Sequence, residues 1–241
     1  MNNYNFAGIL FFMPTKLQKF AEFKKLPGCF TYVYEDRLKG PFGYKGKWNR
    51  EVFGREAPIV LELGCGYGEY TLGLAKNFPE NNYIGIDRKS NRMWTGAMNA
   101  FREIMHHVAF LRTQAEFLPD CFGEKEVSSI WLTFPDPQEQ KSKEKKRLTS
   151  PRFIELYKKI LAPDGIVHLK TDNAILFEYT IDILEKNQLP VLFLSENVYA
   201  AQAENSLEAA WIKTATSIQT RYERMFSALG HSIKYIVFRL S

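Results

Sequence analysis

The chain has 241 residues, of which 45% are hydrophobic and 15% aromatic, and this composition excludes a largely disordered protein. The length fits one large α/β domain. A formal net charge of +5 favours a polyanionic partner without requiring one. Cys29, Cys65 and Cys121 form no C-x-x-C pair, which argues against a zinc site or disulfide scaffold and favours a reducing, cytoplasmic setting.

The beginning of the chain divides into two segments before the main domain. The apolar stretch at 6–13 is too short to cross a bilayer, and no Lys or Arg precedes it, so neither a membrane anchor nor a signal peptide is predicted. We predict that residues 1–13 are a disordered extension. Residues 14–57 are rich in Gly and Pro and are predicted to form an irregular N-terminal arm. The main domain is then 58–241.

Downstream of Pro58, apolar runs alternate with stretches of helical periodicity. The predicted strands are 59–63, 83–87, 108–111, 129–134, 166–170, 191–194 and 233–238, and the predicted helices are 68–77, 90–105, 150–161, 173–187 and 207–228. This order predicts an α/β fold with a mostly parallel, doubly wound sheet of about seven strands and helices on both faces. Ligands of such sheets bind beyond the carboxyl ends of the strands.

The first of these strands runs into three alternating glycines, Gly64, Gly66 and Gly68. Glycine permits a tight turn and a close approach of the backbone to a ligand, and the following helix start offers free N–H groups. The pattern is acidic-x-G-x-G-x-G from Glu62. It departs from the dinucleotide fingerprint because Glu69 stands where that motif has its third glycine. A glycine-rich turn without a ligand is the alternative.

This pattern resembles the first motif of class I S-adenosylmethionine-dependent methyltransferases, which have a Rossmann-like fold. The resemblance implies S-adenosylmethionine as cofactor, with Glu62 near its cationic methionine moiety. Asp87 ends the second strand, where the carboxylate that binds ribose hydroxyls is expected, or it caps the next helix. Gln114 and Ala115 follow the third strand at the expected adenine corner, or they belong to a solvated loop.

The fourth strand ends in Phe134-Pro135-Asp136-Pro137. The two prolines restrict the backbone on either side of Asp136, so its carboxylate is predicted to be held beside the methyl group, as a catalytic and cofactor-contacting residue. A purely structural turn is the alternative. Five cations follow within ten residues: Lys141, Lys143, Lys145, Lys146 and Arg147. They predict either a solvated loop or, because they adjoin the active-site strand, a contact with RNA phosphates.

Taken together, these motifs resemble the bacterial tRNA (guanine-N7)-methyltransferase family, from about Lys16 to Phe238. Leu169-Lys170-Thr171-Asp172 and Thr220-Arg221-Tyr222-Glu223 complete the resemblance, the latter as the family's Thr-x-aromatic-Glu motif. It implies methylation of N7 of a guanine in the tRNA variable loop, by a methyltransferase domain at 58–241. The substrate-binding residues that it implies are Gln140, Lys141, Asp172, Thr220, Arg221, Tyr222 and Glu223.

In the expected mechanism, Asp136 and Glu223 accept hydrogen bonds from the N1/N2 edge of guanine, supported by Asp172 and Thr220. Simpler roles are an N-cap for Asp172 and an exposed helix face for Thr220 to Glu223. The scattered histidines predict no metal site, and no pattern specifies an oligomeric state.

The chain departs from the family pattern at three positions. Gln138 replaces a frequent Trp, Gln140 replaces a Lys, and Gln114 replaces the Asp of an Asp-Ala pair. The rival functions are methylation of a small molecule or protein, and RNA binding without catalysis.

Overall fold

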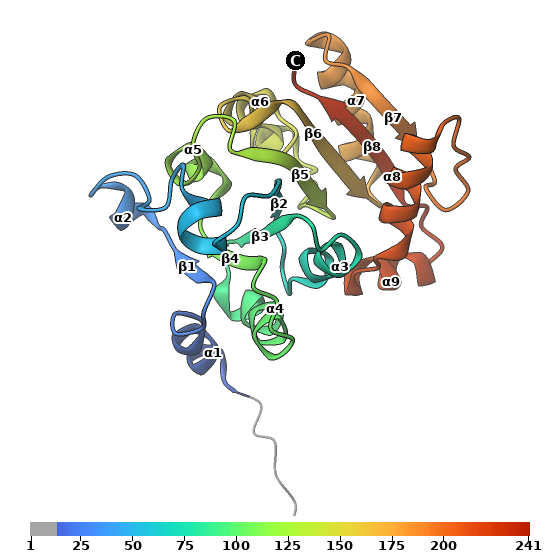
Figure 1. The fold of residues 1–241 in the computed structure, drawn as a ribbon. Helices are drawn as coiled ribbons and strands as arrows, with labels where there is room; N and C mark the ends of the chain where they lie inside the picture. The colour runs from blue at the N-terminus through green and yellow to red at the C-terminus, as the bar shows by residue number, and fades with distance from the viewer. Residues whose placement is uncertain (1–13) are drawn as a thin grey trace, which may run out of the picture.

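An eight-stranded sheet forms the centre of the structure, a computed structural model that describes residues 14–241 (Figure 1). The strand order is β1-β4-β3-β2-β5-β6-β8-β7. All pairings are parallel except those of β8 with β6 and β7. The strands are β1 (Cys29–Thr31), β2 (Ile59–Leu63), β3 (Asn82–Asp87), β4 (Val108–Arg112), β5 (Val127–Thr133), β6 (Leu161–Thr171), β7 (Val191–Ser195) and β8 (Lys234–Arg239). The extension predicted at 1–13 lies outside the described residues.

The two faces of the sheet are covered by different helices, as the α/β prediction requires. On β2, Leu61 and Leu63 pack toward α5, α6 and α7, whereas Val60 packs toward α1, α3, α4 and α8. The helices are α1 (Lys16–Phe23), α2 (Tyr34–Arg37), α3 (Glu69–Asn77), α4 (Ser90–Arg102), α5 (Leu118–Cys121), α6 (Pro151–Lys158), α7 (Ala174–Lys186), α8 (Ser206–Ser217) and α9 (Arg221–Ala228). Shorter turns are η1 (Trp48–Phe53), η2 (Ala115–Phe117) and η3 (Lys141–Lys146).

The sheet has eight strands where about seven were expected, because β1 comes from the segment predicted to be irregular. Cys29 to Thr31 pair in parallel with β4 at the sheet edge. Trp48 from the same segment is fully buried, and its indole N–H donates to the carbonyl of Cys121. Segment 14–57 therefore contributes to the core on both faces of the sheet, with Trp48 on one face and Phe23 on the other.

The helix predicted over 207–228 is two helices, α8 and α9, separated at Ile218 to Thr220. Thr220 is the N-cap of α9, and its hydroxyl accepts a hydrogen bond from the backbone N–H of Glu223 at 3.1 Å. This break turns the chain beside the N-terminus of α3, where Glu69 accepts from the backbone N–H of Arg221 (Figure 1). The break thereby brings the Thr220 region to the carboxyl ends of the strands.

A single buried ring, that of Phe110 on β4, fills the space in front of three glycines. A Cβ added to Gly68, Gly85 or Gly96 would lie within 2.9 Å of this ring. At Gly96 it would also lie 2.7 Å from the carbonyl oxygen of Tyr67. The missing side chains therefore let α3 and α4 approach the sheet closely, and they fix the glycine-rich turn against α4.

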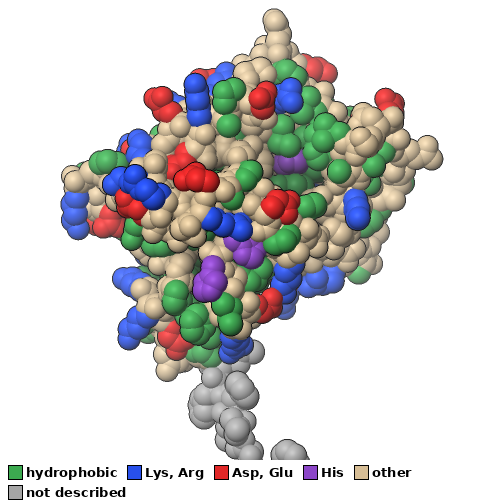
Figure 2. Space-filling model, viewed as in Figure 1, with side chains coloured by type: hydrophobic (Ala, Val, Ile, Leu, Met, Phe, Trp, Pro, Cys, Tyr) green, Lys and Arg blue, Asp and Glu red, His purple; other side chains and the backbone are tan. Residues whose placement is uncertain are grey.

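Basic and acidic side chains are interspersed over the face seen in Figure 2. Within residues 14–241, no helix is long and apolar enough to cross a membrane. Among the same residues, no group of three or more His, Cys, Asp or Glu side chains is arranged to hold a metal ion.

Candidate active site

The glycine-rich turn connects β2 to α3 at the carboxyl edge of the sheet. Gly64, Gly66 and Gly68 have φ values of +78°, +55° and +76°, which L side chains rarely adopt. A Cβ on Gly64 would have no neighbour within 4 Å, and one on Gly66 would only approach the Gly64 carbonyl at 3.9 Å. The backbone at Gly64 and Gly66 is thus open toward a cavity, whereas Gly68 allows the turn to pack closely against Phe110 and Gly96.

We expect alanine at Gly66 and at Gly68 to separate ligand binding from stability. Both substitutions strain a left-handed backbone, but only Gly68→Ala forces a methyl group into the Phe110 ring. Gly68→Ala should therefore cost about 1–3 kcal/mol more in unfolding free energy than Gly66→Ala, the usual effect of overpacking. Gly66→Ala should lower the affinity for S-adenosylmethionine and should lower the unfolding free energy less than Gly68→Ala does. Equal denaturation midpoints for the two variants would contradict the packing role of Gly68.

Glu62 at the end of β2 is buried at 3% exposure and borders the cavity behind the glycine turn. One carboxylate oxygen accepts from the backbone N–H of Thr71 at 2.7 Å and from the Thr71 hydroxyl. The other accepts from the hydroxyl of Thr133 at 2.6 Å. Burial raises the pKa of Glu62 to about 7, although these hydrogen bonds partly oppose the shift.

This raised pKa predicts that cofactor affinity depends on pH. A cation placed beside Glu62 favours the ionised carboxylate, so binding below the pKa must first remove a proton. Affinity for S-adenosylmethionine should therefore fall as pH drops below 7, by up to about tenfold per pH unit. Calorimetry between pH 5.5 and 8 measures this, and Glu62→Gln should flatten the profile. A wild-type profile as flat as that of Glu62→Gln would contradict the role of Glu62.

Asp87 ends β3 and ties that strand to the glycine turn. Its carboxylate accepts from the backbone N–H of Gly66 at 3.0 Å and from that of Lys89 at 2.9 Å. Asp87 is only partly buried and lines the cavity. Asp87 is not the N-cap of α4, which is Lys89, so the alternative role as a helix cap is not observed. Its carboxylate lies where a ribose-binding carboxylate is expected.

Two adjoining cavities open at this edge of the sheet, with volumes of about 720 and 370 Å³. Both are bordered by Gly64, Asp87, Arg88, Gln138, Lys146 and Leu148. The smaller is apolar on one side, where Ile86, Ala115 and Phe153 line it. Gln114 precedes η2, and its carbonyl accepts from Phe117 at 2.9 Å, but its side chain does not border either cavity. Ala115 thus lies at the adenine corner expected from the sequence, and Gln114 lies beside it.

The turn after β5 carries Asp136 into the larger cavity. Pro135 is buried, whereas Asp136 is exposed and accepts from the backbone N–H of Gln138 at 3.1 Å. Phe134 and Gln138 flank the turn with positive φ values of +48° and +45°. Strained backbone of this kind persists where the surrounding structure enforces it, and it is common at functional sites.

The cationic residues after this turn differ in their solvent exposure and in the cavity that they border. Gln140 and Lys141 are exposed, and Lys141 borders a groove between η3 and α7 rather than the glycine-turn cavities. Lys146 lines both of those cavities. Arg147, expected to contact RNA phosphates, is instead 4% exposed and bonded to backbone carbonyls. The structure does not support that expectation for Arg147, because its side chain is buried and its Nε and Nη2 donate to backbone carbonyls.

In the segment from Thr220 to Glu223, two of the four residues border the larger cavity. Thr220 and Tyr222 line the larger cavity. Glu223 is fully buried, with its carboxylate 2.7 Å from the Lys170 ammonium and accepting from the hydroxyl of Tyr199. Arg221 is exposed. The motif is therefore not simply an exposed helix face.

Asp172, from the end of β6, does not border either of the cavities. Its carboxylate lies 3.9 Å from Nδ1 of His231. The N-cap of α7 is the neighbouring Asn173, which accepts from the backbone N–H of Leu176. Asn173, and not Asp172, is therefore the N-cap of this helix.

Sequence reasoning missed several residues at this site. The larger cavity is also lined by Arg88 and Lys89, which precede α4, and by Arg92, in the first turn of α4. Their position directly after Asp87 is the signal that would have found them. Thr71 and Thr133, which hold Glu62, could not be found from the sequence, since they lie on separate elements.

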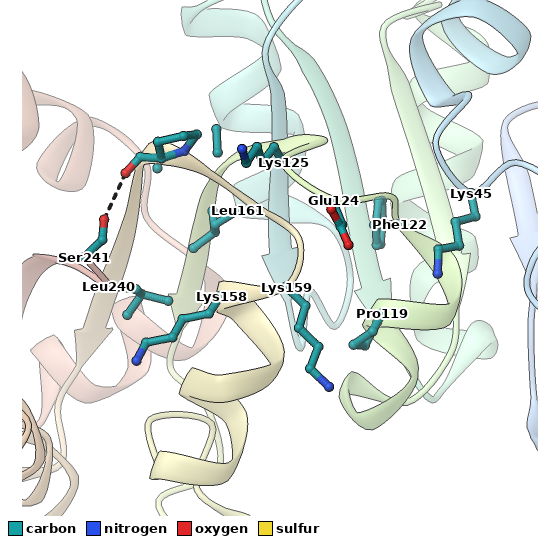
Figure 3. Close-up of a pocket in the computed structure, with 13 residues that line it drawn as sticks. Lys45, Pro119, Phe122, Glu124, Lys125, Lys158, Lys159, Leu161, Leu240 and Ser241 are labelled. Atoms are coloured by element: carbon teal, nitrogen blue, oxygen red, sulfur yellow. Dashed lines mark hydrogen bonds between the residues drawn. The ribbon is translucent and has the colours of Figure 1, made fainter.

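A further cavity of about 670 Å³ lies at the opposite edge of the sheet. Figure 3 shows Lys45, Lys125, Lys158 and Lys159 around it, together with the C-terminal residues Leu240 and Ser241. None of the site residues predicted from the sequence borders it.

The open backbone at Gly64 and Gly66, with carboxylates at the ends of β2 and β3, fits a ligand that carries a cationic group and ribose hydroxyls. Solved structures share the fold: the 16S rRNA methyltransferase KamB has a TM-score of 0.56 at 13% identity, covering 78% of this chain and 90% of that one. A structure described as an antibiotic-related methyltransferase has the same TM-score at 16% identity, with the same coverage. The fold is that of the class I methyltransferases.

Sequence comparisons narrow this class. A family described as putative methyltransferase matches residues 56–236. The tRNA (guanine-N(7)-)-methyltransferase of Bacteroides thetaiotaomicron is 49% identical over 93% of this chain and 85% of its own length. That of Porphyromonas gingivalis is 45% identical over 89% of this chain and 85% of its own length. The chain belongs to the tRNA (guanine-N7)-methyltransferase family.

Proposed function

We propose that this enzyme methylates N7 of a guanine in the variable loop of tRNA, with S-adenosylmethionine as the methyl donor. The observation that carries the proposal is the attachment of the cation-rich η3 to the turn that holds Asp136 at the cavity. RNA phosphates could contact η3 while a base enters the cavity. A cytoplasmic location is part of the same proposal, because tRNA is the substrate.

Alignment is the main requirement of the reaction. Guanine N7 carries an in-plane lone pair and no proton, so its attack on a methyl group needs positioning more than a strong base. Gly64, Gly66, Asp87 and Ala115 would hold the cofactor, which supplies an electrophilic methyl group when bound. The Asp136 carboxylate would accept hydrogen bonds from the N1/N2 edge of guanine and offset the positive charge that develops on the ring.

The residues predicted to bind the substrate fall into three groups. Thr220 and Tyr222 border the cavity and are proposed to contact the base. Glu223 is bound to Lys170 and Tyr199, so we propose that it supports the turn before α9 instead of contacting guanine. Gln140, Lys141, Asp172 and Arg221 lie outside the cavity lining, and we propose that they contact RNA beyond the target base.

The direct test incubates the protein with methyl-labelled S-adenosylmethionine and unmodified tRNA, followed by nucleoside mapping. The proposal requires 7-methylguanosine at a variable-loop position. Label in a small molecule or protein instead would support the chief rival function. Cofactor and tRNA binding without any transfer would support a non-catalytic RNA-binding protein.

The η3 lysines give a second test, based on salt dependence. Replacing Lys141, Lys143 and Lys145 by Ala should flatten the plot of log tRNA affinity against log salt by about two to three units, since each phosphate contact contributes about 0.7–0.9. Lys146 is left unchanged, because it lines the cofactor cavities. The matched control replaces Lys125, Lys158 and Lys159 at the far cavity (Figure 3). Parallel lines for both triple variants and wild type would remove η3 as an RNA contact.

A further inference from the structure

Arg147, directly after η3, is a buried cation that has no role in the proposed reaction. Its guanidinium donates from Nε to the carbonyl of Pro137 at 2.9 Å and from Nη2 to the carbonyl of Gln138 at 3.2 Å. On its other side it lies 4.3 Å from the ring centre of Tyr179, on α7. No carboxylate of residues 14–241 lies within ion-pair distance of it. Backbone carbonyls and an aromatic face therefore compensate its charge.

Both carbonyls belong to the turn that presents Asp136. The turn is strained, because Phe134 and Gln138 hold positive φ values, and such residues cost about 1–3 kcal/mol each. Gln138 links the two residues: its carbonyl accepts from Arg147, and its N–H donates to the Asp136 carboxylate. A continuous path of hydrogen bonds thus runs from Arg147 through Gln138 to Asp136.

The chemistry of arginine suits this task, and that of lysine does not. A planar guanidinium can donate to two carbonyls in fixed directions while its face stacks on an aromatic ring. An ammonium group is compact and strongly hydrated, and it would reproduce neither the paired geometry nor the stacking. The contacts therefore require an Arg at this position, whereas a phosphate-binding role would be filled by either cation.

We propose that Arg147 is a positioning residue that holds the Asp136 turn in its strained, active geometry. The claim of a catalytic consequence rests on the proposed function, because it assumes that Asp136 acts on the substrate base. Arg147 then affects turnover through Asp136. It makes no contact with RNA phosphates, in contrast to the role proposed for the exposed lysines that precede it in η3.

Arg147→Lys is the main test variant, since it conserves charge and most of the side-chain length. We expect its kcat for tRNA methylation to fall on the order of tenfold to a hundredfold, as for small misplacements of a catalytic group. KM for tRNA and the salt slope of tRNA binding should stay within error of wild type. Tyr179→Leu, which removes only the stacking partner, should change kcat in the same direction by less. Guanidinium ion at millimolar concentration should partly restore kcat in Arg147→Ala.

A second readout does not depend on catalysis. Hydrogen exchange at the backbone N–H of Gln138, which binds Asp136, should accelerate in Arg147→Lys and Tyr179→Leu, while exchange in β2, β3 and β4 stays unchanged. This measurement tests the positioning role even if wild type methylates no tRNA, so the two proposals can fail separately. Unchanged exchange at Gln138 would overturn the inference. So would unchanged kcat in Arg147→Lys, or a salt slope lowered by about 0.7–0.9 in Arg147→Ala, which marks a phosphate contact.

Discussion

Replacing Asp136 by Ala is expected to lower kcat for tRNA methylation by about 10²- to 10³-fold, the effect of removing one aligned electrostatic partner from an active site. Asp136 is the exposed carboxylate of the turn at the end of β5, and it borders the cavity behind the glycine turn. Affinity for tRNA should change less than tenfold, since phosphate contacts supply most of it. Asp136→Asn should lie between alanine and wild type, because an amide accepts a hydrogen bond without carrying a charge.

Three measurements separate the possible roles of Asp136. Single-turnover rates at saturating cofactor isolate methyl transfer, tRNA titration measures substrate affinity, and calorimetry measures cofactor affinity. Asp164→Ala is a matched control, since Asp164 is an exposed aspartate next to a proline at the far edge of the sheet. A wild-type single-turnover rate in Asp136→Ala would show that the turn is structural. A loss confined to cofactor affinity would assign Asp136 to the methionine moiety.

The second large effect is a loss of stability, which we expect when Lys170 is replaced by Met. The Lys170 ammonium is fully buried, 2.7 Å from the Glu223 carboxylate, and it also donates to the carbonyls of Ala215 and Ile218. Burial lowers the pKa of Lys170, and the Glu223 charge opposes that shift. Removing one partner of a buried pair leaves an uncompensated charge and costs about 3–5 kcal/mol. In a chain of this length, Tm should fall on the order of 10 °C.

A second substitution distinguishes loss of the charge pair from loss of packing. Lys170→Met combined with Glu223→Gln removes both charges and should recover part of the lost Tm. Lys186→Met is the surface control: Lys186 lies 3.8 Å from Asp182 with both side chains mostly exposed, and such pairs contribute about 0–1 kcal/mol. An unchanged Tm in Lys170→Met would mean that the pair does not stabilise the α8–α9 region.

Local sequence patterns predicted the secondary structure correctly where a segment's own residues determine it. The run Ile59–Leu63, which is apolar except for Glu62, coincides with β2, because a strand buried on both faces is mostly apolar. In contrast, β1 has only three residues and no alternation, and its pairing with β4 supplies the only reason for it to be a strand. The break before α9 had a local signal in Thr220 and Glu223, which match a helix N-terminus.

The site was predictable where motifs follow strand ends, and less so where long-range contacts decide a residue's role. Glycine spacing and the two prolines located the turns that carry Gly66 and Asp136. The surroundings of Arg147 depend on Tyr179, 32 positions away along the chain, and those of Glu223 depend on Lys170. No local pattern distinguishes Arg147 from the exposed lysines beside it, so charge alone predicted a phosphate contact, whereas the structure buries this side chain.

The Phe110 ring also constrains how this protein can evolve. A methyl group at Gly85 meets the ring, so a substitution at this glycine becomes tolerable only after residue 110 has become smaller. Shrinking residue 110 first leaves a cavity and costs about 2–5 kcal/mol. Gly68 and Gly96 have no such route, because Gly68 has a φ of +76° and a methyl group on Gly96 would also meet the Tyr67 carbonyl. Across descendants of this sequence, positions 85 and 110 should therefore change together or not at all, whereas positions 68 and 96 should stay glycine in every lineage that keeps the turn.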